Sequence, residues 1–328
     1  MQSFLDPAIL FFVFGLLAGA LRSNLEIPPQ IARFLSLYLL MALGLKGGFA
    51  LHQSGLTMDV AVSLGCALLL ATVVPLLGYH LLKRVLSGYD AAAIAATYGS
   101  VSAVTFITAV QYLDNHNVAY GGHMAAAMAL MESPAIIMAV LLANMVRQRE
   151  KEQSLAAESR TVRNTPLSRI LHESVTDGAQ LVLLGAMVIG IVTGQSGHDA
   201  MQPFAGDLFK GMLAFFLLDM GLLAARNMGE LKGKPLWLLA YAVLAPLVHA
   251  GLALGLAAAA GVNAGNAALL MVLAASASYI AVPAVVRYAI PEADPSLYVS
   301  LSLGVTFPLN ILVGIPLYTQ VVLRLWGG

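Results

Sequence analysis

The sequence predicts an all-α integral membrane protein of about ten transmembrane helices, arranged as two inverted five-helix repeats. Three observations predict this class: the composition, the spacing of the apolar segments, and polar interruptions at matching places in the two halves. Hydrophobic residues make up 59% of the 328 residues and charged residues only 10%, with a mean hydropathy of +0.82. Such a chain has too few polar side chains to cover a soluble globule of this size.

Apolar segments long enough to cross a bilayer recur along the whole chain. A transmembrane helix needs about 20 mostly apolar residues to cross about 30 Å of hydrocarbon. Candidate spans begin near Pro7, Gln30, Asp59, Asp90, Ala119, Val175, Pro203, Pro235, Gly265 and Ser296. We therefore expect a first five-helix repeat over residues 1–146, a polar linker over 147–173 and a second repeat over 174–328.

The positive charges predict the orientation of these spans. If the linker 147–173 is cytoplasmic, most Lys and Arg residues fall in loops on the same side, and the exceptions are Lys46, Lys210 and Arg324. This bias is typical of cytoplasmic loops and supports an even number of spans. We expect a multi-pass protein of the cell inner membrane with both termini outside.

An odd number of spans in each half makes the second half insert upside down relative to the first. Small residues recur in the same order, because Gly15 and Gly19 of the first span correspond to Gly190 and Gly194 of the sixth. One such match is common packing chemistry in membrane helices. The shared order of several matches favours an inverted repeat.

The fourth and ninth spans each contain clustered hydroxyls and helix-breaking residues, in the runs YGSVSAVT at 98–105 and SASYIAVP at 276–283. Inverted repeats often place broken helices at mid-membrane, where helix N-termini face an anion and hydroxyls and free carbonyls bind a cation. We predict a substrate site here, with Pro283 beginning the second half of the ninth span. The alternative is that these hydroxyls bond only within their own or neighbouring helices.

Other classes of function find little support in the sequence. The formal net charge is zero, which gives no basic surface for nucleic acid. The seven histidines show no paired-ligand spacing, and no nucleotide-binding signature or catalytic constellation is visible. The single cysteine, Cys66, excludes an internal disulfide. We expect no enzyme activity and no cofactor.

Several short motifs resemble those of the sodium-dependent bicarbonate transporters first recognised in cyanobacteria. The family's fourth-span pattern Gly-x-Val-Ser-x-x-Thr is met at 99–105, and its ninth-span run is similar to Ala-Ala-Ser-Ala-Ser at 274–278. The motifs Ile290-Pro291 and Thr306-x-Pro308 are also similar. The resemblance extends over nearly the whole chain.

This resemblance implies a core domain of spans three to five and eight to ten that moves against a gate domain of spans one, two, six and seven. It also implies a homotrimer, and bicarbonate held by backbone amides and hydroxyls where the broken spans cross, with sodium close by. The expected substrate-binding residues are Gly99, Ser100, Ser102, Thr105, Ser276, Ser278 and Tyr279. Glu132 and Thr306 are the candidates for cation binding or proton coupling, since a carboxylate within the membrane is a functional candidate by default.

The chain departs from the family where an Asp follows the ninth-span serines, because Tyr279 stands there. Our prediction is a secondary active transporter that imports bicarbonate or a similar small anion, coupled to sodium, by an elevator type of alternating access. One alternative is a permease for another small carboxylate with proton coupling. Another is a membrane receptor or docking platform whose linker binds a PII-like cytoplasmic regulator.

Overall fold

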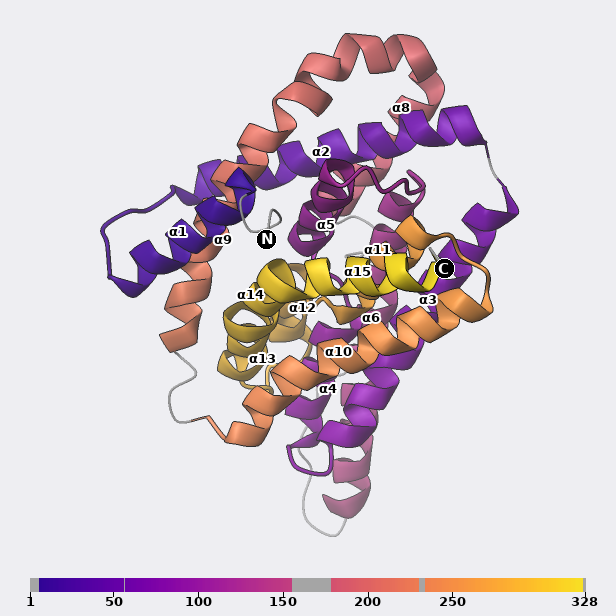
Figure 1. Cartoon of the computed structure of the whole chain (residues 1–328). Coiled ribbons are helices and arrows are strands. Elements are labelled where there is room, and N and C mark those ends of the chain that lie inside the picture. The colour runs from indigo at the N-terminus through magenta and orange to yellow at the C-terminus, as the bar shows by residue number, and fades with distance from the viewer. Residues whose placement is uncertain (1–5, 56, 155–177, 230–233, 327–328) are drawn as a thin grey trace.

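The computed structural model describes residues 6–55, 57–154, 178–229 and 234–326, and these ranges contain helices and no strands (Figure 1). The helices of the first half are α1 (Pro7–Ala20), α2 (Pro29–Ser54), α3 (Met58–Leu82), α4 (Gly88–Gly99), α5 (Ala103–Asn115) and α6 (Met124–Ser154). The main helices of the second half are α8 (Gly178–Met201), α9 (Phe209–Gly229), α10 (Leu236–Ala259), α11 (Ala264–Ala275), α12 (Ala281–Ala289), α13 (Pro295–Leu301), α14 (Phe307–Leu309) and α15 (Ile315–Trp326). Short π-helical segments precede α9 and lie on either side of α14.

Seven segments of the described chain are long and apolar enough to cross a membrane. They are Pro29–Gln53, Met58–Leu82, Gly88–Asn115, Met124–Arg147, Leu181–Gly229, Leu236–Ala259 and Pro295–Trp326. Leu181–Gly229 has 49 residues and contains most of α8 and all of α9. The all-α membrane class predicted from composition is therefore confirmed.

Two expected span starts are wrong. The fifth span was expected from Ala119, but α6 begins at Met124. The reason is a turn after α5, where Asn117 has a φ of 56° and the Val118 N–H bonds to the Leu113 carbonyl at 3.0 Å. The seventh span was expected from Pro203, but this residue lies in the π-helical segment Gln202–Asp207, and α9 begins at Phe209.

Two helix pairs approach so closely that their contacts require glycine. A Cβ on Gly15 of α1 would lie 2.3 Å from the Leu218 carbonyl oxygen and 3.1 Å from the Gly221 Cα, both on α9. A Cβ on Gly48 of α2 would lie 2.2 Å from the Met187 carbonyl oxygen of α8. The pairs α1 with α9 and α2 with α8 therefore form one body of tightly packed helices.

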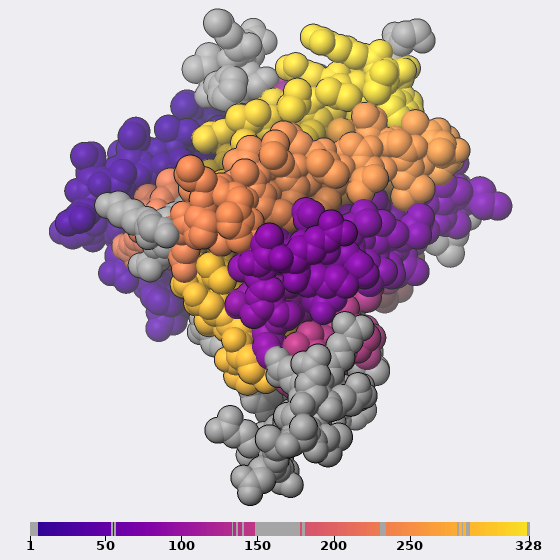
Figure 2. Space-filling model, turned by 90° about the horizontal axis from the view of Figure 1, so that it is seen from below, coloured from indigo at the N-terminus to yellow at the C-terminus, as the bar shows by residue number. Residues whose placement is uncertain are grey.

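The remaining helices form a second body that contains both helix interruptions. Here α3 packs against α4 and α6, while α10 and α15 pack against α11. Figure 2 shows α3 and α10 side by side across one face of the molecule. Figure 1 shows α1, α2 and α8 on the opposite part of the molecule from α4, while α9 extends toward α13 and contacts it.

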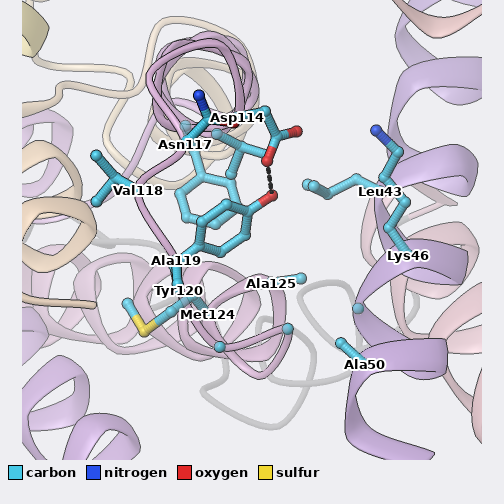
Figure 3. A pocket seen from close by; sticks show the side chains of 15 residues that line it. Leu43, Lys46, Ala50, Asp114, Asn117, Val118, Ala119, Tyr120, Met124 and Ala125 are labelled. Carbon is cyan, nitrogen blue, oxygen red and sulfur yellow. Dashed lines mark hydrogen bonds between the residues drawn. The ribbon is translucent and has the colours of Figure 1, made fainter. Parts of the chain in front are cut away.

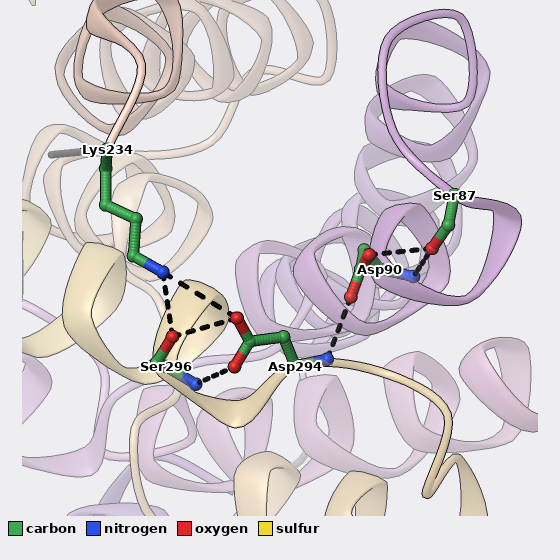
Figure 4. Close-up of polar contacts among 5 residues, drawn as sticks. All are labelled: Ser87, Asp90, Lys234, Asp294 and Ser296. Carbon is green, nitrogen blue, oxygen red and sulfur yellow. Dashed lines mark hydrogen bonds and ion pairs between the residues drawn. The ribbon is translucent and has the colours of Figure 1, made fainter.

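A polar network joins three segments at one end of the second body (Figure 4). The Asp294 N–H donates to Asp90 Oδ1 at 2.8 Å, and the Ser87 hydroxyl donates to Asp90 Oδ2 at 2.7 Å. Lys234 Nζ donates to Ser296 Oγ at 2.8 Å and lies 3.7 Å from Asp294 Oδ2. Partial burial acts to raise the pKa of Asp294, but hydrogen bonds from Ser296 and the Lys234 charge outweigh it and hold that pKa below its usual range.

Arg147 extends the fold beyond the predicted end of the first repeat. Its guanidinium bonds to both carboxylate oxygens of Glu292, at 2.9 and 2.7 Å, and to the Ala289 carbonyl at 2.9 Å. This ion pair between buried Arg147 and exposed Glu292 holds α6 in place, and the helix continues to Ser154 through the first residues of the predicted linker 147–173. The rest of the predicted linker, 155–173, lies outside the described residues.

We predict that Gly48→Ala destabilises the protein, because the added methyl would overlap the backbone of α8. Overpacking of this kind costs about 1–3 kcal/mol of unfolding free energy. Gly65→Ala is the matched control, since a Cβ there meets nothing within 4 Å. A clear fall in the apparent melting temperature in detergent is expected for Gly48→Ala alone, and equal melting temperatures would refute the close packing.

Candidate functional site

The two predicted helix interruptions are present, and they contact each other. The first separates α4, which ends at Gly99, from α5, and the second separates α11 from α12. The Ser102 N–H donates to Ser276 Oγ at 3.0 Å, and the Ser278 N–H donates to the Thr97 carbonyl at 2.8 Å. Each interruption therefore supplies an acceptor for a backbone N–H of the other, as non-helical backbone within a membrane requires.

Serine side chains fix the backbone where each second half-helix begins. The Ser102 hydroxyl caps α5 by accepting from the Thr105 N–H at 3.2 Å, and the Ser278 hydroxyl accepts from the Val282 N–H at 3.2 Å. The expectation that Pro283 begins the ninth span's second half is wrong, because α12 begins at Ala281. A proline is tolerated in the first turn of a helix. It has no backbone N–H, and an N–H at this place would find no acceptor within the helix.

A cavity of about 80 Å³ lies at the crossing. Its wall comes from both helix bodies: from α2, α8, the start of α5, α6 and the second interruption. The lining residues are Ser36, Leu40, Val101, Ser102, Ala103, Val104, Met128, Ala129, Glu132, Leu183, Ser278, Tyr279 and Ile280. A volume of this size suits an ion of a few heavy atoms and excludes a large metabolite.

Two hydroxyls of the first interruption are buried without a hydrogen-bond partner. Ser100 Oγ and Thr105 Oγ1 have no partner among the described residues, and both side chains are 1% exposed. They stand on either side of the cavity-lining run 101–104. A buried polar atom without a partner costs about 1–3 kcal/mol, but neither residue lines the cavity itself.

Tyr279, the candidate for substrate binding, and Glu132, the candidate for cation binding or proton coupling, both line the cavity. The Tyr279 ring centroid lies 5.1 Å from that of Phe307, and its hydroxyl lies 3.6 Å from the sulfur of Met220 on α9. Tyr279 therefore connects the two helix bodies. Glu132 on α6 is the only charged residue among the described lining residues.

Gly99 and Thr306 do not line the cavity. A Cβ on Gly99 would lie 2.6 Å from the ring of Pro75, so this glycine permits close packing of α4 on α3. The Thr306 hydroxyl donates to the Ala242 carbonyl at 2.8 Å and also bonds to the Tyr98 hydroxyl at 2.7 Å. The structure thus gives both residues packing contacts next to the site.

Sequence analysis missed Asn310, which supports the second interruption. Its Nδ2 donates to the Ala275 carbonyl at the end of α11, at 2.8 Å, and its Oδ1 accepts from the Tyr318 hydroxyl at 3.3 Å. Asn310 is 1% exposed. The sequence feature that could have revealed this role is a single amide side chain within the apolar run PLNILVG at 308–314.

A larger cavity of about 490 Å³ lies beyond the first one along α2, α5 and α6 (Figure 3). Its charged lining residues are Lys46 and Asp114, and the Tyr120 hydroxyl donates to Asp114 Oδ1 at 2.9 Å. Lys46 Nζ lies 4.3 Å from the ring centroid of Phe209. This cavity, which we call the vestibule, lies along the part of α2 that contains Lys46. Lys46 was expected near the outer face.

The vestibule and the small cavity follow the same helices. Leu43 of the vestibule lies one turn from Leu40 of the small cavity, and Met124 lies one turn from Met128. The two cavities are therefore neighbours along α2 and α6.

These features define a helical multi-pass membrane protein with a small polar cavity where two interrupted helices cross. Residues 7–323 match the sequence model of the Na+-dependent bicarbonate transporter superfamily, so the chain belongs to this superfamily. The resemblance inferred from short motifs is thereby confirmed, and the chain belongs to a family of transporters rather than enzymes. No curated protein sequence matches the chain significantly.

Replacing Ser276 should destabilise the crossing. Ser276→Ala leaves the buried Ser102 N–H without its acceptor, which costs about 1–3 kcal/mol of unfolding free energy. Ser302→Ala is the control, because that buried hydroxyl bonds only to carbonyls of its own preceding turn. The apparent melting temperature in detergent should fall more for Ser276→Ala, and an equal or smaller fall would show that this bond contributes little.

Proposed function

We propose that this chain is a secondary active transporter that imports bicarbonate or a similar small anion, coupled to sodium, by an elevator type of alternating access. The observation that carries the proposal is the crossing of the two interruptions, where Ser102 and Ser278 line a cavity of about 80 Å³. Membership of a Na+-dependent bicarbonate transporter superfamily supports both the anion and the cation.

Helix N-termini at the cavity support binding of a monovalent anion, together with a cation that pairs with the Glu132 carboxylate. No Lys or Arg lines it among the described residues. The residues at the start of α5 and just before α12 do line it, so the positive ends of two helix dipoles lie at the cavity. Helix ends and hydroxyls bind an anion with less Coulomb energy than a buried cation would supply, which suits a substrate that must also be released.

The coupling ion requires oxygen ligands, and the cavity wall and the residues beside it in the chain offer several. Ser100 and Thr105 have buried hydroxyls without partners among the described residues, and Glu132 contributes a carboxylate to the cavity wall. We propose that sodium uses some of these oxygens. Glu132 also favours a second candidate, proton coupling with another small carboxylate as substrate, because a carboxylate in a membrane cavity can carry a proton.

The packing supports an inverted repeat of ten spans, with residues 1–146 and 174–328 as its halves. Gly15 of α1 contacts Gly221 of α9, and Gly48 of α2 contacts Gly190 of α8. If α8 and α9 repeat α1 and α2, these two contacts are equivalent with the halves exchanged. The same close approach of two backbones would then occur twice, because each half of the chain supplies one copy of each helix in the pair.

The division into two bodies supports the proposed elevator motion. We propose that α1, α2, α8 and α9 form the gate and that the other helices form the moving core. The gate contributes Ser36, Leu40 and Leu183 to the cavity, while Ser102 and Ser278 belong to the core. Sliding of the core against the gate would carry the bound ion from one side of the membrane to the other.

The assembly and location rest on the family resemblance and the charge bias. We propose a homotrimer in the cell inner membrane, with both termini outside and the linker 147–173 cytoplasmic. The proposed docking of a PII-like regulator would use the linker, most of which lies outside the described residues. Deletion of 155–159 should then abolish regulator capture without stopping uptake.

Uptake of labelled bicarbonate into proteoliposomes tests the proposal. At fixed pH and membrane potential, an inward sodium gradient should stimulate uptake by the wild-type protein. The double variant Ser102→Ala, Ser278→Ala should lose at least about 90% of this uptake, because loss of two hydrogen bonds of about 1 kcal/mol each lowers affinity more than tenfold.

Ser302→Ala serves as the control for hydroxyl loss elsewhere in the core, and size-exclusion profiles verify folding. Normal uptake by the double variant would refute the site. Uptake driven by a proton gradient and unaffected by sodium would favour the second candidate, and in that case Glu132→Gln should abolish it.

A further inference from the structure

An apolar groove of about 470 Å³ runs between α3 and α10, away from the cavities described above. Gly78 of α3 lies on its floor, and a Cβ there would lie 3.1 Å from the Tyr241 hydroxyl of α10. Figure 2 shows this face, with α3 and α10 side by side. The groove belongs to the surface of the molecule.

This surface carries exposed apolar side chains suited to contact with the bilayer. The spans of α3 and α10 are 44% and 39% buried, the two lowest values among the candidate spans. Leu81, Leu244 and Val248 line the groove and are more than half exposed, at 56%, 57% and 60%. In a multi-pass membrane protein, exposed apolar side chains on spans contact lipid chains.

The two ends of the groove differ in chemistry. Arg84, which follows α3 and is exposed, is the only Lys, Arg, Asp or Glu among the described lining residues. Trp237 lies in the first turn of α10, and Tyr241, one turn further along α10, faces Gly78 of α3. Trp237 therefore lies at the same end of the groove as Arg84. Tryptophan favours the membrane interface, and arginine binds phosphate through its planar fork of donors.

The groove is long enough to hold an acyl chain across one lipid leaflet. Fifteen residues separate Trp237 from Leu252 at the other end, which corresponds to about 22 Å of helix at about 1.5 Å per residue. Half of the hydrocarbon layer measures about 15 Å. The apolar length of the groove can therefore accept the acyl chain of a lipid whose headgroup lies at Arg84.

We propose that this groove is a binding site for an anionic phospholipid. Its acyl chain lies between α3 and α10, and its phosphate group bonds to Arg84 beside Trp237. The site is independent of the transported ion. It belongs to the body that contains both helix interruptions, so the lipid stays with that body.

Fluorescence quenching by brominated lipids tests this site, because the chain has two tryptophans, Trp237 and Trp326. In a Trp326→Phe background, Trp237 is the only indole. Brominated phosphatidylglycerol in a phosphatidylcholine bilayer should quench it at lower mole fraction than brominated phosphatidylcholine does. Arg84→Gln should reduce this preference about fivefold, the effect of about 1 kcal/mol for one cation near an anionic headgroup.

Arg33→Gln is the matched control, because it removes an exposed cation from α2 rather than from the groove. It should leave the lipid preference unchanged, and Arg84→Lys should retain most of it. Equal quenching by the two lipids in the parent protein, or equal effects of Arg84→Gln and Arg33→Gln, would overturn the proposal. Shielding of Trp237 from both lipids would assign the groove to contact with a second copy of the chain and would overturn it as well.

Discussion

The structure depends on the reciprocal hydrogen bonds between two interrupted helices. Within a bilayer there is no water to satisfy free backbone groups, so one unwound segment alone would leave polar groups unpaired. Here the Ser102 N–H uses Ser276, and the Ser278 N–H uses the Thr97 carbonyl. Asn310 satisfies the Ala275 carbonyl in the same region. Each interruption therefore stabilises the other.

This mutual support fixes the chemistry of the cavity. Because the serine caps hold the starts of α5 and α12, two helix N-termini remain at the same small space without any buried cation. The opposite wall comes from α2 and α8, whose glycine contacts hold them as a separate body. The proposed alternating access depends on this arrangement, a polar site between one pair of packed helices and a second body.

The sequence predicted what depends on local composition. Clustered glycine and serine at 98–105 and 276–283 disfavour continuous helix and offer caps, so both interruptions could be found without a structure. The same holds for most helix starts. The predicted start of α6 was wrong because a turn at Asn117 follows α5, and α6 therefore begins later, at Met124.

The contacts that were missed join residues far apart in the chain. Arg147 was assigned to a solvated linker because its neighbours are charged, yet its partner Glu292 lies 145 residues away. Thr306 and Gly99 were chosen by their motifs, while their actual contacts, Ala242 and Pro75, carry no pattern that links them. Such pairings follow from the packing of whole helices, which periodicity and composition do not determine.

The most direct test of the account is protection of a cysteine placed in the cavity wall. Ala103 lines the cavity without contributing a hydroxyl, and the single native cysteine, Cys66, is buried and can be replaced by alanine. We predict that Ala103→Cys in a Cys66→Ala background reacts with a small water-soluble thiol reagent and that bicarbonate with sodium slows the reaction. A reaction rate unchanged by bicarbonate at any sodium concentration would contradict the central claim that the crossing is the anion site.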